Sequence, residues 1–209
     1  ISNEQETSDR AQKRANSALL ENVNFAEQDL RTFTNDPKFF SRFEFVLSCE
    51  VIEHLSDDRT LMHNMAKCLK PGGRLLLTTP NYHYIAITSD EEGPRSEEEG
   101  ENYGGHVRRG YTPGMFHELC QDAGLIIEEI SYCSGMISQK LTKLLRIMAK
   151  INYKLGWLIV LPLRILPPFL DGIVTRLFRW NFYSICLQAY KPRFQSDDLA
   201  KIIKSKTLL

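Results

Sequence analysis

The chain alternates short apolar runs with longer amphipathic segments, which is the pattern of strands followed by helices. Continuous apolar runs at 43–48 and 74–79 predict two buried strands, and the segments 125–134 and 182–192 predict two more. A shorter apolar stretch at 23–25 predicts a further strand. Because strands that alternate with helices usually pair in parallel, the sequence predicts an α/β domain with a mostly parallel sheet.

Helix-forming composition and end signals predict three helices. Residues 4–20 are rich in strong helix formers. Asp57 is an N-cap candidate for an amphipathic helix at 59–69. Thr112 is the corresponding candidate for a helix at 113–123, whose first residue is proline.

The overall composition is that of one globular domain with balanced charge. The chain has 209 residues, 43% of them hydrophobic and 25% charged, and its formal net charge is zero. Balanced charge gives no general attraction to nucleic acid. The cysteines are five in number and form no CxxC pair, so we expect free thiols, no thiolate zinc site and a cytoplasmic location.

A basic, apolar block lies at 137–180, between the last two predicted strands. It carries eight Lys and Arg residues against the single acid Asp171, a local net charge of +7, interleaved with leucine, isoleucine and aromatic residues. Its longest uncharged run, 155–163, is too short to span a bilayer. The block is either a helical segment that lies in a membrane interface or a cap over an active site, with its apolar face buried on the domain.

Three motifs occur in a recognisable order: FEFVLSCEVIEHL, LKPGGRLLLTTPN and YTPGMFHELCQDAGL. With these spacings the chain resembles class I S-adenosylmethionine-dependent methyltransferases. The resemblance implies a Rossmann-like doubly wound sheet with an antiparallel last strand and ligands beyond the carboxyl ends of the strands. It assigns 1–136 and 181–192 to the methyltransferase domain, 137–180 to a helical insertion between the last two strands, and 193–209 to a polar tail.

The resemblance also implies S-adenosylmethionine as the cofactor. Asp29 matches the position whose carboxylate accepts the adenine amino group, Leu30 lies beside it, and Cys49 matches a position that lines the methionine part. The sequence lacks the glycine-rich turn and the acidic residue that complete this pocket in the family, and 1–15 resembles the segment that follows them. The chain therefore resembles the C-terminal two-thirds of such an enzyme without its first two strands. We expect the chain alone to bind the cofactor weakly or not at all and to be inactive.

Glu50, Glu53 and His54 fall within one helical turn after the strand at 43–48. This ExxEH pattern resembles that of ubiquinone-pathway O-methyltransferases and small-RNA 2′-O-methyltransferases. There the resemblance implies a divalent ion, Mg²⁺ or Mn²⁺, held by these three residues, with His106 as a candidate fourth ligand. In the alternative interpretation the same side chains brace the strand end without a metal. His106 or His54 would then be the general base that accepts the substrate's hydroxyl proton.

The leading hypothesis is methyl transfer from S-adenosylmethionine to a hydroxyl of a lipid-like substrate, a quinone or phenol, or a glycan. It predicts a peripheral membrane contact through 137–180. One alternative is RNA 2′-O-methylation with the basic block on phosphates, but the sequence shows no recognisable RNA-binding module, which argues against a nucleic-acid partner. A second alternative is a non-catalytic, methyltransferase-like module at a membrane.

Overall fold

The computed structural model describes residues 4–25, 37–87 and 106–193. Four strands form its sheet: β1 (Phe43–Cys49), β2 (Leu69–Pro80), β3 (Ile126–Cys133) and β4 (Ser184–Tyr190). Two single 3₁₀ turns are η2 (Pro37–Phe39) and η3 (Ile52–His54). The α-helices are α1 (Glu4–Ser17), α2 (Asp58–Cys68), α4 (Pro113–Asp122), α5 (Met136–Ile151), α6 (Tyr153–Leu163) and α7 (Pro167–Leu177).

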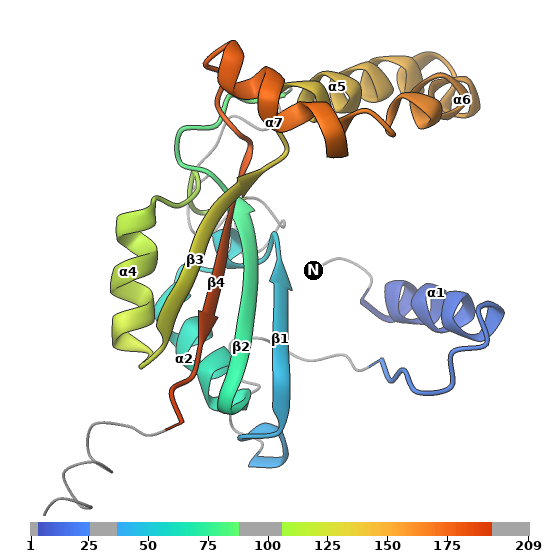
Figure 1. The fold of residues 1–209 in the computed structure, drawn as a ribbon. Helices are drawn as coiled ribbons and strands as arrows, with labels where there is room; N and C mark the ends of the chain where they lie inside the picture. The colour runs from blue at the N-terminus through green and yellow to red at the C-terminus, as the bar shows by residue number, and fades with distance from the viewer. Residues whose placement is uncertain (1–3, 26–36, 88–105, 194–209) are drawn as a thin grey trace, which may run out of the picture.

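The strands lie in the order β1-β2-β4-β3 (Figure 1). β1 pairs with β2 in parallel, and β4 runs antiparallel to both of its neighbours. The four strands predicted from the apolar runs at 43–48, 74–79, 125–134 and 182–192 are therefore confirmed, and so is the antiparallel last strand. β1, β2 and β3 point the same way, so the carboxyl ends of β1 and β2 meet at one end of the sheet.

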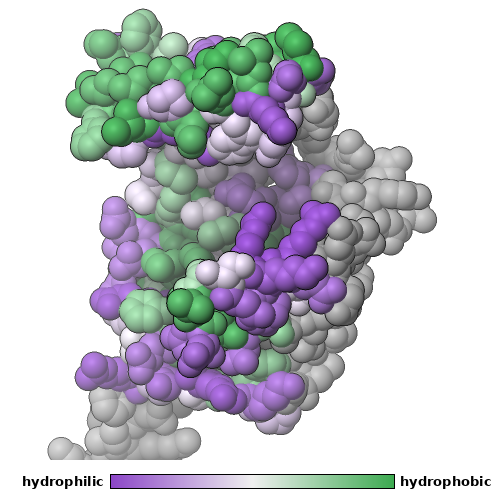
Figure 2. All heavy atoms as spheres, turned by 90° about the vertical axis from the view of Figure 1, so that its right-hand side faces the viewer, coloured by the Kyte–Doolittle hydropathy of each residue, from purple (hydrophilic) through white to green (hydrophobic). Residues whose placement is uncertain are grey.

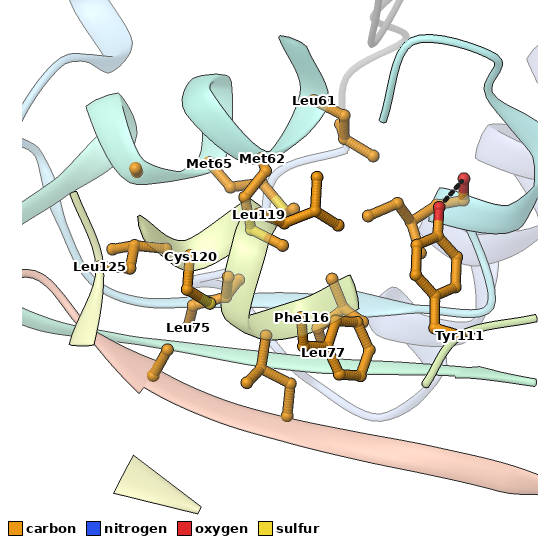
Figure 3. Close-up of a cluster of buried hydrophobic side chains, with 14 of the residues drawn as sticks. Leu61, Met62, Met65, Leu75, Leu77, Tyr111, Phe116, Leu119, Cys120 and Leu125 are labelled. Carbon is orange, nitrogen blue, oxygen red and sulfur yellow. Dashed lines mark hydrogen bonds between the residues drawn. The ribbon is translucent and has the colours of Figure 1, made fainter. Parts of the chain in front are cut away.

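The hydrophobic core lies between one face of the sheet and the helices α2 and α4 (Figures 1 and 3). Leu75 and Leu77 of β2 and Leu187 of β4 are buried against Met62 of α2 and Phe116 of α4. Both helices form where the sequence predicted them, because their caps are local. The Asp57 carboxylate accepts the N–H of Thr60, and the Thr112 hydroxyl accepts the N–H of Met115.

The predicted strand at 23–25 is wrong. Residues 21–25 have no strand conformation, and the Phe25 side chain is 39% exposed. A strand requires a partner for its backbone groups, and the described sheet ends at β1 on the side where α1 lies (Figure 1). The helix that precedes this stretch is confirmed, although α1 ends at Ser17, three residues before the predicted end.

Helices α5, α6 and α7 lie together beyond the carboxyl ends of β1 and β2 (Figure 1). We call these three helices the cap. None of the described helices is by itself long and apolar enough to cross a membrane. Only α6 and α7 together pass on length and composition, with a bend of 81° between them.

An acid from α7 holds the start of α5. The Asp171 carboxylate accepts the N–H groups of Gly135 at 2.9 Å and Ile137 at 2.7 Å, and the Ser138 hydroxyl at 2.6 Å. The Thr175 hydroxyl accepts the N–H of Met136 at 2.8 Å. Residue 135 must be glycine, because a Cβ there would lie against the Thr175 hydroxyl and 2.8 Å from the Asp171 carboxylate. These bonds satisfy N–H groups that the first turn of any helix leaves unpaired.

Candidate active site

The site begins where β1 ends. Glu50 follows Cys49 in a left-handed backbone conformation, with φ of +52°, which is uncommon for a residue other than glycine. Its N–H donates to the carbonyl of Thr78 on β2 at 2.9 Å, so the turn stays attached to the sheet. The following turn, η3, then places Glu53 and His54 at the end of the sheet. Left-handed, strained residues of this kind cluster at functional sites.

Glu53 is fully buried, although it is a carboxylic acid. The Thr79 hydroxyl donates to its Oε2 at 2.8 Å. Its Oε1 has no hydrogen-bond partner among the described residues and lies 3.9 Å from the Nε2 of His54. Most buried polar atoms in folded proteins do have a partner, so a buried carboxylate oxygen without a donor indicates a place for a proton or a cation.

The loop at 106–111, distant in the sequence, brings a second histidine, His106, to this carboxylate. The N–H of Val107 donates to the Glu53 carbonyl at 2.9 Å, and the N–H of Tyr111 donates to the Pro80 carbonyl at 2.9 Å. Gly110 permits this approach, because its φ is +146° and a Cβ there would overlap the Pro80 carbonyl. As a result the ring of His106 lies 4.8 Å from the ring of His54, edge to face.

Glu53, His54 and His106 therefore form a group of three metal-binding residue types. One ligand atom from each lies within 4.8 Å of the others. Ligands bound to an ion at about 2.1 Å are at most about 4.2 Å apart, so small side-chain movements would close this group on an ion. The resemblance implies Glu50, Glu53 and His54 as metal ligands, with His106 as the candidate fourth ligand. The structure brings three of these four residues together and places Glu50 nearby, outside the group of three.

Burial raises the pKa of the carboxyls of both Glu50 and Glu53 above the ordinary glutamate value. Hydrogen bonds oppose this effect: Ser184 donates to Glu50 at 3.3 Å, and Thr79 donates to Glu53. Because burial is the largest cause for both groups, each acid holds its proton to a higher pH than an exposed glutamate does. A cation between the carboxyl and the imidazoles would compete with that proton.

These residues line one wall of a cavity of about 460 Å³. The facing wall comes from the cap, where Ser138, Thr142 and Arg146 of α5 follow one another at four-residue spacing. Ser184 of β4 and the neighbouring Tyr183 line the cavity as well. None of these five residues was predicted as a site residue from the sequence. The polar stripe at every fourth residue of α5 was the available signal.

The α5 wall is fixed by a buried amide. Gln139 donates to the carbonyls of Ser134 at 2.9 Å and Asn181 at 2.8 Å, and its own oxygen accepts the indole N–H of Trp180 at 2.9 Å. All of these partners lie at the two chain ends where the cap joins the sheet. The orientation of α5 over the cavity is therefore determined by hydrogen bonds as well as by packing.

The residues predicted to bind the cofactor are only partly placed. Cys49 is exposed at the carboxyl end of β1 and is not part of the cavity wall. Asp29 and Leu30 lie outside the described residues. All five cysteines are free thiols, as predicted, although the sulfur atoms of Cys133 and Cys186 lie only 3.3 Å apart across β3 and β4.

Residues 4–130 match the family model described as a methyltransferase domain. The chain belongs to the methyltransferase domain family. Among solved structures, the methyltransferase domain resembles the cyclase SpnF, with a TM-score of 0.55 at 17% identity, over 88% of this chain and 62% of SpnF. It also resembles an S-adenosylmethionine-dependent methyltransferase from Mesorhizobium loti, with a TM-score of 0.51 at 17% identity, over 88% of this chain and 77% of that one. These likenesses confirm the Rossmann-like methyltransferase fold.

The curated relatives of this methyltransferase domain share a single name. A ubiquinone biosynthesis O-methyltransferase from Coxiella burnetii is 34% identical over 65 residues, which are 31% of this chain and 26% of the relative. The protein of the same name from Marinobacter nauticus is 24% identical over 142 residues, 64% of this chain and 52% of the relative. The matched part therefore spans about a quarter of the first relative and about half of the second.

Proposed function

We propose that this methyltransferase domain carries the acceptor half of an S-adenosylmethionine-dependent O-methyltransferase. The observation that supports the proposal best is the buried Glu53 carboxyl, whose Oε1 has no hydrogen-bond donor among the described residues and faces two imidazoles. A hydroxyl nucleophile must lose a proton during methyl transfer. The Glu53 carboxyl and the two imidazoles can accept that proton, or they can bind a cation in its place. A cavity lined by hydroxyl side chains lies directly beside it.

The roles of the side chains follow from their positions. The acceptor hydroxyl lies in the cavity, where Ser138, Thr142 and Ser184 offer hydrogen bonds that orient it. Without a bound metal, His106 accepts its proton, and the Glu53 carboxylate stabilises the single imidazolium that results. S-adenosylmethionine, the cofactor of the family, supplies the electrophilic methyl group when bound. The exposed carboxyl end of β1 at Cys49 is the described position that fits the cofactor's methionine part.

A divalent ion is the alternative to the general base, because a ring nitrogen of His106 that binds an ion cannot also accept the substrate's proton. One carboxylate and two imidazoles suit Mn²⁺ or another transition metal better than Mg²⁺, which prefers oxygen ligands. Three protein ligands leave coordination positions for a substrate oxygen, and a bound ion would lower the pKa of that hydroxyl. Glu53, His54 and His106 would hold the ion, and the unpartnered Oε1 of Glu53 is the atom that most needs it.

The substrate class is inferred from two supports. The relatives are named ubiquinone biosynthesis O-methyltransferases, which favours a quinone or phenol hydroxyl on a lipid-like molecule. The cavity also lies against α5 of the cap, whose neighbouring helices expose many apolar side chains. A glycan remains compatible with the polar cavity wall but has no support from the exposed apolar surface.

Binding of Mn²⁺ to this chain tests the ion site without any need for cofactor. We expect saturating Mn²⁺ to raise the melting temperature of the wild-type chain, since an ion at 100 times its dissociation constant adds about 2.7 kcal/mol of stability. Glu53→Gln and His106→Ala should abolish the increase, and His117→Ala, an exposed histidine on α4, should retain it. Equal stabilisation of all four proteins would refute the ion site.

Methylation of a hydroxyquinone, followed with labelled cofactor in the full-length protein, tests the chemistry. We expect His106→Ala to lower kcat by about 10²- to 10⁴-fold, the contribution of a general base. Activity that survives chelation but disappears in His106→Ala would leave the base role standing and remove the ion. Activity unchanged in both His106→Ala and Glu53→Gln would remove the proposed site altogether.

A further inference from the structure

The cap carries an exposed hydrophobic surface that the candidate site does not use. More than half of the large hydrophobic side chains that are exposed in the described residues fall between 147 and 178. Figure 2 shows hydrophobic side chains gathered over the cap, at the top of that view. The most exposed include Ile151, Leu158, Phe169 and Leu177, each above 70%. Monomeric soluble proteins rarely expose an apolar surface of this extent without a partner.

The cap is also strongly basic, and one of its cations, Arg146, lines the cavity. All eight Lys and Arg residues of the block 137–180 are exposed. The single acid of the block, Asp171, is buried and already accepts the N–H groups at the start of α5. Its negative charge is therefore inside the cap, and the cap surface presents only positive charge. Exposed apolar side chains surrounded by cations are typical of helices that lie on anionic membranes.

The positive charge of the cap favours an anionic lipid surface over a second copy of this chain as the partner. A second copy of this chain would have to place one basic cap against another, because a two-fold interface brings the same patch together from both subunits. Like charges that face each other across an interface cost several kcal/mol. An anionic lipid surface offers opposite charge to the Lys and Arg residues and an apolar interior to the leucines and phenylalanines.

The shape of the cap fits a surface contact. α6 and α7 have 11 residues each and are bent by 81° at the break between them, which Pro167 follows directly. A helix of that length spans only about 16 Å, roughly half of the hydrocarbon thickness. Two cations lie over aromatic rings: Arg164 is 5.1 Å from the centre of the Trp157 ring, and Lys140 is 4.5 Å from that of Trp180. Paired cations and indoles suit the headgroup region.

We propose that the cap is a docking surface for an anionic lipid bilayer. α5 joins this surface to the candidate site, because Arg146 and Thr142 line the cavity while Lys143 and Ile147 of the same helix are exposed. Docking places the cavity wall at the membrane surface. Delivery of a lipid-borne hydroxyl into the cavity rests on the proposed function, whereas docking itself does not depend on any catalytic step.

The two tryptophans of the chain provide a direct test, because both lie at the cap, Trp157 in α6 and Trp180 just after α7. The probe is a vesicle of phosphatidylcholine and phosphatidylglycerol at about 2:1, compared with phosphatidylcholine alone. We expect the wild-type chain to float with the anionic vesicles and its tryptophan emission to shift to shorter wavelength. Brominated acyl chains should quench the emission of the wild type but quench Trp157→Phe less.

Variants separate the apolar and the charge contributions. Leu158→Glu and Phe169→Glu change side chains that are each 73% exposed, so the fold should tolerate them, and we expect each to weaken vesicle binding at least about tenfold. Lys143→Gln and Lys150→Gln should each weaken binding about fivefold, since one basic residue near an anionic surface contributes about 1 kcal/mol. Leu19→Glu, at an 87% exposed position outside the cap, should leave binding unchanged.

Three outcomes would overturn the proposal. The first is the absence of flotation with anionic vesicles. The second is binding that Leu158→Glu and Phe169→Glu leave intact. The third is resistance to an alkaline carbonate wash, which would show a spanning segment in place of a surface contact. Flotation requires neither cofactor nor Mn²⁺, so it can be measured independently of methylation. A His106→Ala protein that loses methylation but still floats would show that docking and chemistry are separate properties.

Discussion

Glu53 is the residue that gives the candidate site its character. A fully buried carboxyl with one oxygen that has no donor among the described residues lowers the stability of the fold by roughly 1–3 kcal/mol, and by more if the acid is charged. The nearest groups that could compensate this cost are the two imidazoles. Residues that weaken a fold in this way are concentrated at functional sites, where their chemistry is used.

The raised pKa of the Glu53 carboxyl predicts a pH dependence of stability. Its pKa in the folded chain lies above the ordinary value of 4.5 because of burial, so the folded state holds more protons than the unfolded state from about that pH upward. Stability should therefore fall as pH rises from 4.5 through the raised pKa. Glu53→Gln should flatten this part of the curve and melt at the same or a higher temperature at pH 8. Melting temperatures measured between pH 4 and pH 8 check both expectations.

Glu50→Gln is the matched control for this experiment, since burial also raises the pKa of the Glu50 carboxyl, which accepts a hydrogen bond from Ser184 as Glu53 does from Thr79. It should flatten the pH dependence less than Glu53→Gln does, because Glu50 is exposed whereas Glu53 is fully buried. A Glu53→Gln curve that follows the wild type at every pH would show that folding does not shift the pKa of the Glu53 carboxyl.

The spacing of Glu50, Glu53 and His54 correctly predicted that these residues lie close together, but it could not predict the position of each side chain in the site. Spacing within one turn shows which side chains are near each other along the chain. It does not show that Glu53 is fully buried while Glu50 is exposed and has a left-handed backbone conformation. The contribution of His106 depends on a loop that is attached through the backbone of Val107, 54 residues after Glu53, and only the resemblance pointed to it.

At the scale of elements, α5 depends on α7 as much as on its own sequence. Its N-cap position is a glycine, which contributes no side chain to the first turn. Asp171 and Thr175, one helical turn apart on α7, provide the acceptors that a serine or aspartate at that position would normally supply. The cap is therefore a unit whose helices stabilise one another through buried hydrogen bonds.

Asp171→Ala should destabilise the chain by about 3 kcal/mol, because it removes a helix cap and leaves buried N–H groups without a partner. For a chain of this length the melting temperature should fall by about 6–12 °C. Asp57→Ala, which removes the ordinary local cap of α2, is the control and should cost only about 1 kcal/mol. Denaturant unfolding measures both values.

If the two variants lose equal stability, Asp171 acts as a simple cap and does not hold the cap helices together. Hydrogen exchange provides a second check. Asp171→Ala should speed exchange along α5 and at Gln139 more than in α2, since the bonds lost lie at the start of α5.

Elements were predictable from the sequence where their determinants are local. Asp57 and Thr112 act on N–H groups three residues away, so the sequence shows both partners within one window. Asp171 acts across more than 30 residues, and nothing near it in the sequence marks Gly135 as its partner. The strand predicted at 23–25 failed for a related reason, because apolar character does not provide the neighbouring strand that a β conformation requires.

At the scale of the whole molecule, the described residues expose two apolar surfaces, one on the cap and one on β1. Phe43, Phe45 and Leu47 alternate along β1 and expose the same face, with Phe45 at 60% and Leu47 at 68%. β1 is also the last strand in the order of the described sheet. Positive charge protects the cap from its own copies, whereas the three exposed side chains of β1 carry no charge.

We therefore expect this chain to self-associate through β1 and not through the cap. Phe45→Lys with Leu47→Lys should weaken self-association at least about tenfold, because two large apolar side chains leave the contact. Light scattering over a range of concentrations measures the effect. Leu158→Lys on the cap is the control and should change nothing, and a control that disrupts the oligomer as strongly would place the contact on the cap.

The order of the strands also determines when each part of the fold can form during translation. β3 pairs only with β4 in the described sheet. The start of α5 is capped only after Asp171 has been made, and the cavity wall is complete only after Ser184 has been made. At 5–20 residues per second, the 35 residues between the start of α5 and Asp171 take roughly 2–7 seconds to translate. During that interval β3 has an open edge and α5 has an uncapped end. The candidate site is thus one of the last parts of the chain to form, and a ribosome paused before residue 184 holds a protein without it.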